Sequence, residues 1–172
     1  MSYLGNDIIA LMTGGALTSE FSYPIQIENL TVSPASLLAV YLTGLGHVTS
    51  PSSAQDWPLY ISNLPDTPDN AAVIFNSTPI KDAKLMQTGN VIHHYGVEIL
   101  LRCVNDEDGW DKCNILAGEL DILRNVFVSI NDSTYKIHNV TRLGGVNSLG
   151  SESDSRRRNM FSMNFTVSIT NV

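Results

Sequence analysis

The chain has 172 residues, of which 43% are hydrophobic and 16% charged, and its formal net charge is −7. This balance excludes a disordered tail, which needs high charge and few apolar groups, and a long charged helix, which needs far more Glu and Lys. The acidic sign also argues against wrapping a nucleic-acid backbone, which requires a basic surface. We therefore expect a single domain over residues 1–172 with a hydrophobic core of its own.

The first elements along the chain are weakly patterned. Leu4, Ile8 and Leu11 share one face of a short helix predicted over residues 4–12. Apolar residues then alternate loosely over residues 21–27, which predicts a strand or an arm. We expect residues 1–32 to be an N-terminal arm or extension.

A helix is predicted from Ser33 to Leu45. Serine caps the free backbone amides of a helix start, and proline at the first helical position has its φ already set. The apolar residues Leu37, Leu38, Tyr41 and Leu45 follow at helical spacing before Gly46. Residues 47–70 read as loop, interrupted by a short edge strand over residues 57–61.

Strands are predicted over residues 71–75 and 95–103, joined by a polar connection over residues 77–90. In the second strand the odd positions from Tyr95 to Cys103 are apolar, which is typical of a half-buried strand.

A second helix is predicted over residues 110–123, with one apolar stripe running from Trp110 to Leu123. Acidic residues precede it and complement the positive end of its dipole. Strands over residues 126–130 and 135–140 then form a hairpin.

The chain ends with a loop or β-connection over residues 143–155 and a regular strand over residues 161–170. Together these elements predict an α+β fold: a mostly antiparallel β-sheet with the two main helices packed on one face.

Charge is unevenly distributed. Residues 1–80 contain no Lys or Arg, whereas Arg156, Arg157 and Arg158 are consecutive. Such polarity suits self-association, with the basic spot of one copy against the acidic face of another, and equally suits a solvated surface. The three arginines are accordingly a solvated loop, a subunit or partner contact, or a nucleic-acid contact.

The candidates for chemistry are weak. Adjacent strand residues point to opposite faces, so His93 and His94 are poorly placed to share a metal ion. The acidic run Asp106 to Asp108 is explained by the start of the second helix, and it lacks calcium-loop spacing. No nucleophile elbow or phosphate-binding loop is present. We expect no catalytic residue, metal or cofactor, and no membrane span.

Cys103 and Cys113 fall at predicted core positions and read as small buried hydrophobic residues of a protein in a reducing compartment.

The polar face of the last strand is free of charge, and exposed strands are usually protected by charge. Coverage by another chain is therefore one interpretation, and an ordinary solvated face is the other. The residues of this face are Ser162, Asn164, Thr166, Ser168 and Thr170.

The order of these elements resembles the tail terminator proteins of long-tailed bacteriophages, also called tail-completion or minor tail proteins. The matching features are Ser33–Leu45 with Gly46, residues 65–69, Tyr95–Arg102, Trp110–Leu123, residues 126–140, Leu149-Gly150, Glu152, Arg157 and Phe161–Phe165.

The resemblance implies a small α+β subunit that closes into a hexameric ring. In this family the ring caps the tail tube, stops its polymerisation and provides the surface for head-neck joining. The implied partners are further copies of the chain, the tail tube protein and head-neck connector proteins. DNA passes through the lumen without sequence-specific binding. The implied location is the head-proximal end of the virion tail, after assembly in the host cytoplasm.

Two alternatives remain open at this point. One is another neck, head-tail connector or tail tube protein, which would share the charge and the fold. The other is a monomeric metal- or ligand-binding module using His93 or His94.

Overall fold

The computed structural model describes residues 30–52, 56–84, 91–152 and 156–172, with the backbone alone for residues 79–84 and 91–93. The predicted helix 4–12 and the predicted strand or arm 21–27 lie outside the described residues. Along the chain the elements are α1 (Pro34–Gly44), β1 (Leu59–Ile61), β2 (Ala71–Lys84), β3 (Val91–Cys103), α2 (Asp106–Ile122), β4 (Arg124–Ile130), β5 (Ser133–Arg142), β6 (Asn147–Ser151) and β7 (Asn159–Asn171).

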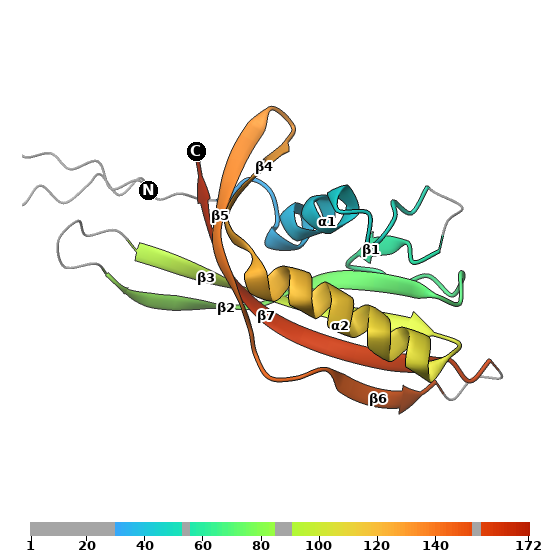
Figure 1. The fold of residues 1–172 in the computed structure, drawn as a ribbon. Coiled ribbons are helices and arrows are strands. Elements are labelled where there is room, and N and C mark those ends of the chain that lie inside the picture. The colour runs from blue at the N-terminus through green and yellow to red at the C-terminus, as the bar shows by residue number, and fades with distance from the viewer. Residues whose placement is uncertain (1–29, 53–55, 85–90, 153–155) are drawn as a thin grey trace, which may run out of the picture.

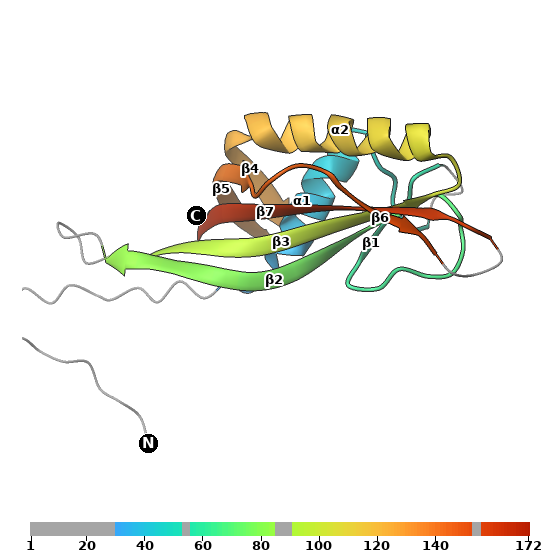
Figure 2. The same cartoon turned by 90° about the horizontal axis from the view of Figure 1, so that it is seen from below.

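The predicted α+β fold is confirmed. The strands form one sheet in the order β1-β2-β3-β7-β5-β4, and β6 pairs with β7 beyond the end of β5. Strand β1 is parallel to β2, and the other pairs are antiparallel. Both helices lie on the same face of the sheet (Figures 1 and 2).

The start of α1 follows the rules from which it was predicted, whereas α2, predicted over residues 110–123, begins at Asp106. Ser33 caps α1 by accepting a hydrogen bond from the backbone N–H of Ser36 at 3.1 Å, and Pro34 follows. Asn105 caps α2 by accepting from the N–H of Glu107 at 3.1 Å. The acidic residues expected ahead of α2 form its first turn, where they still face the positive end of the dipole.

One core lies between the helices and the sheet. The odd positions of β3 and β7 face it together, as the register pairs Leu101 with Phe161 and Ile99 with Met163. Cys103 and Cys113 are buried there as free thiols, as predicted. Burial raises the pKa of Cys103 to about 11 and that of Cys113 to about 12, so both stay protonated near neutral pH.

Three predictions of local structure are corrected. Residues 77–84, predicted as a connection, continue β2, and β3 begins at Val91 rather than Tyr95. Their mixed polarity carries no strand period, so pairing between the two strands decides their structure. Leu45, predicted to be on the apolar face of α1, is 42% exposed. Trp110, predicted to be in the apolar stripe of α2, is 43% exposed.

No helix among the described ranges is both long and apolar enough to cross a membrane.

Two glycines of α2 give a matched test of this packing. A Cβ at Gly109 would collide with Sγ of Cys103 and lie 2.7 Å from the Phe161 ring, whereas Gly118 has nothing within 4 Å. We expect Gly109→Ala to destabilise the protein by about 1–3 kcal/mol through overpacking. Gly118→Ala should stabilise it by about 0.5–1 kcal/mol through helix propensity. Urea unfolding measures both changes, and a gain in stability at Gly109 would contradict the close contact of α2 with β3 and β7.

Candidate functional site

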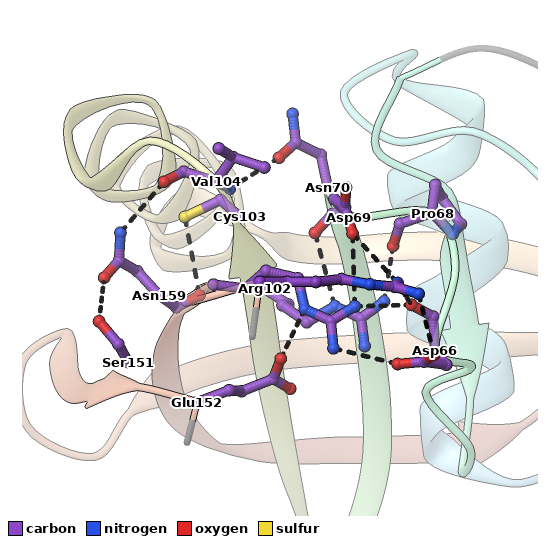
Figure 3. A network of polar contacts seen from close by, with 12 residues as sticks. Asp66, Pro68, Asp69, Asn70, Arg102, Cys103, Val104, Ser151, Glu152 and Asn159 are labelled. Atoms are coloured by element: carbon purple, nitrogen blue, oxygen red, sulfur yellow. Dashed lines mark hydrogen bonds and ion pairs between the residues drawn. The ribbon is translucent and has the colours of Figure 1, made fainter. Parts of the chain in front are cut away.

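Three arginines gather at one end of the sheet. Arg102 is on the face of β3 away from the helices, and Arg156 and Arg158 lie in the segment that leads into β7. Arg102 and Arg158 are each 2% exposed. Figure 3 shows Asp66, Pro68 and Asp69 on one side of the Arg102 side chain and Glu152 on the other. We call these seven residues the arginine cluster.

The partners of these arginines come from two loops. Arg102 donates to the carbonyl oxygens of Pro65 and Pro68 at 2.7 and 2.6 Å. Arg158 donates through Nε to Glu152 at 2.6 Å and through Nη2 to Asp66 at 3.1 Å. The cluster therefore fastens residues 65–69 and Glu152 to the sheet.

The contacts and burial in the cluster shift the pKa values of Asp66 and Arg102. The hydrogen bond from Arg158, followed by the charge of Arg156, lowers the pKa of Asp66 below its ordinary value. Burial lowers the pKa of Arg102, and the neighbouring Arg158 charge lowers it further. No buried side-chain nitrogen or oxygen in the described ranges lacks a hydrogen-bond partner. The arrangement supports the fold and holds Glu152, which follows β6, in place.

Strand β6 is the second feature at this end of the molecule. All five of its residues are exposed, and residues 143–151 carry no formal charge. In the described part of the chain it pairs with β7 alone, so its outer edge is open. The ring of Trp110 packs edge-on against the ring of Phe161, with 6.2 Å between the two ring centroids. Because Phe161 is paired with Ser148 of β6, Trp110 lies near this edge. We call Asn147–Ser151 together with Trp110 the β6 edge.

The predicted contact residues are divided by the structure. Arg158 is buried in the arginine cluster, Arg156 pairs with Asp66 and Asp69 at 3.3 and 3.4 Å, and Arg157 is exposed. Within the chain, Arg158 therefore faces the two loops rather than the outer surface.

The polar face of β7 does not lie at a sheet edge, because β7 is flanked by β3 and β5. The argument from edge protection therefore does not apply to it. Ser162 and Ser168 are buried, while Asn164 and Thr166 are partly exposed. Ser168 contacts Nδ1 of His94 at 2.7 Å.

The other candidates form no metal cluster in the described part of the chain. The side chain of His93 lies outside it, and no three His, Cys, Asp or Glu residues within it come together as metal ligands. Sequence reasoning placed Arg102 at an outward position of its strand but missed its burial, and it left β6 within a stretch described as a loop or β-connection. An arginine at an outward position of a strand was the available signal for the first, and the charge-free run 143–151 was the signal for the second.

Comparisons with known proteins assign no family. No family model matches the chain, and no curated protein matches it. A solved structure whose name states no function is 12% identical, with a TM-score of 0.39, over 78% of this chain and 89% of that one.

The arginine cluster can be tested by changing its buried member. We expect Arg158→Met to destabilise the protein by about 2–3 kcal/mol, because it removes hydrogen bonds between charged groups. The exposed neighbour provides a comparison, and Arg157→Met should destabilise the protein less than Arg158→Met, because the Arg157 side chain is not buried. Chemical unfolding of both variants measures the difference, and equal effects would mean that the cluster does not hold the loops.

The same cluster predicts a dependence on pH. Because the folded pKa of Asp66 is depressed, its stabilising effect is present above the unfolded pKa of about 3.9 and is lost as the pH falls through the folded value. Asp66→Asn should therefore lower Tm at pH 7, and the difference from wild type should shrink below about pH 4. Asp132→Asn, in the β4–β5 turn, is the control. A difference in Tm that stays constant down to pH 2 would contradict this role of Asp66.

Proposed function

We propose that this chain is a structural virion protein: a phage tail terminator that closes into a ring, hexameric as in the family it resembles. The ring caps the tail tube, stops its polymerisation and presents a surface for head-neck joining. The observation that carries the proposal is the charge-free outer edge of β6, because edge strands exposed to water are usually protected by charged side chains.

The other open edges of the sheet differ from β6. Strand β1 has only three residues. Strand β4 begins with Arg124, and the ammonium group of Lys136 lies 5.8 Å from the centre of the exposed Phe127 ring on this strand. The part of β2 beyond β1 includes Lys81 and Lys84 in its sequence. Strand β6 is also short and has a bulge between Ser148 and Gly150, but its edge carries no charge. This absence of charge supports contact with a further chain.

The charge of α2 supports the same function. Its sequence contains six acidic residues and one Lys: Asp106, Glu107, Asp108, Asp111, Glu119, Asp121 and Lys112. The four acidic residues of its first half are exposed. An acidic face of this kind suits the wall of a channel through which DNA passes, because it repels the phosphate backbone.

The assembly state separates this function from its alternatives. We expect light scattering coupled to gel filtration to give one closed oligomer whose mass does not grow with concentration. A heterologous contact that fails to close produces filaments, which would favour a tube protein instead. A monomer at every concentration, alone and with tail tubes, would contradict the ring.

The function itself is tested in assembling phage. Without the terminator, tail tubes should grow to irregular lengths, and the purified chain should bind one end of isolated tubes in electron micrographs. Tails of normal length in particles that lack the chain would contradict the proposal.

A further inference from the structure

The segment that follows the predicted arm enters the described structure at a fixed point. Leu30 packs against the core, and the hydroxyl of Thr31 contacts the hydroxyl of Tyr135 at 2.5 Å. Tyr135 lies opposite Asn171, at the last residues of β7. Strand β6 pairs with the other end of β7, from Asn159 to Ser162.

The outer edge of β6 carries no charge, and the strand is five residues long with a bulge between Ser148 and Gly150. A neutral strand is the partner that suits such an edge. Residues 21–27 contain no charged residue and have apolar side chains at Phe21, Tyr23, Ile25 and Ile27. Such a strand presents one apolar face. Trp110 is 43% exposed and packs against Phe161, the residue paired with Ser148 of β6, so it offers an apolar surface near this edge. Pro24 falls on the other face and is tolerated in a strand that becomes the new edge of a sheet.

The chain between Ile27 and Leu30 is too short for residues 21–27 to reach the β6 edge of the same molecule. The stretch of β7 from Ser162 to Asn171 spans about 30 Å at the usual rise of a strand. Ile27 precedes Leu30 by three residues, which extend to about 11 Å at most. A strand formed by residues 21–27 therefore cannot lie along β6 of the same molecule.

We propose that the β6 edge, Asn147–Ser151 with Trp110, binds residues 21–27 of a second copy of this chain as an added β-strand. The main-chain groups of β6 supply the hydrogen bonds, and Trp110 receives the apolar side chains. Donor and acceptor are different surfaces, so the contact is heterologous and repeats from copy to copy until a ring closes. Glu20 and Glu28 flank the donor and fall outside the paired strand. The inference rests on the self-association proposed above and names its surface.

Disulfide trapping between full-length chains tests the contact directly. One variant carries Ser148→Cys on β6, and a second carries Tyr23→Cys or Ile25→Cys in the donor. Under mild oxidation we expect a crosslinked dimer in the mixture of the two variants, seen on a non-reducing denaturing gel. The matched control is Ser129→Cys, an exposed serine on the edge strand β4, which should not crosslink to either donor variant. The wild type, with its two buried thiols, gives the background.

A charge on the edge gives a second readout without added thiols. Ser148→Lys should weaken association about tenfold in sedimentation experiments, since a lysine on an edge strand opposes strand addition. Ser129→Lys on β4 should leave association unchanged.

The outcomes separate the two proposals. An oligomer that forms without the crosslink, or that crosslinks equally through Ser129→Cys, would overturn this contact and leave the ring. A crosslink confined to one chain in the double variant Ser148→Cys/Ile25→Cys would also overturn it. A specific crosslink between chains, combined with tails of normal length in particles that lack the protein, would support the contact and overturn the terminator function.

Discussion

The structure depends on the hydrogen bonding of β7, the strand on which the rest of the sheet is built. Backbone N–H and C=O groups buried in a sheet must be paired, and β7 is paired on both sides. Strand β3 covers one side from His94 to Cys103. On the other side β5 ends at Arg142, opposite Phe165, so the remaining residues of β7 need another partner. Strand β6 is that partner, and it has an open edge of its own.

The arginine cluster completes the same end of the molecule. Two desolvated guanidinium groups require acceptors, and the loops that supply them are thereby held in place. One of these acceptors, Glu152, directly follows β6, and its N–H donates to the carbonyl of Arg158 at 2.8 Å. The buried charges and the exposed edge are thus parts of one local structure.

The sequence predicted those parts of the fold in which local pattern and tertiary packing agree. The helix start at Ser33-Pro34 was confirmed. The alternations from Tyr95 to Cys103 and from Phe161 to Ile169 each indicated a strand with one buried face, and these two strands were confirmed as well. Residues 77–84 were misassigned, because their pairing with β3 depends on a partner distant in sequence rather than on their own period. The burial of Arg158 was equally hidden, since its acceptors Asp66 and Asp69 lie some ninety residues earlier in the chain. For the site, the three consecutive arginines were visible in the sequence, whereas the strand that offers an edge was not recognised.

The attachment of Thr31 to Tyr135 has a geometric consequence for assembly. With Leu30 anchored in the core, Glu28 and Asn29 are the only residues between the donor strand and the body of its subunit. A neighbouring subunit must therefore bring its acceptor to within roughly one nanometre of that anchor. Such a short tether would fix the distance and angle between adjacent subunits, so that the circumference of the assembly is encoded in the fold rather than adjusted by a flexible linker.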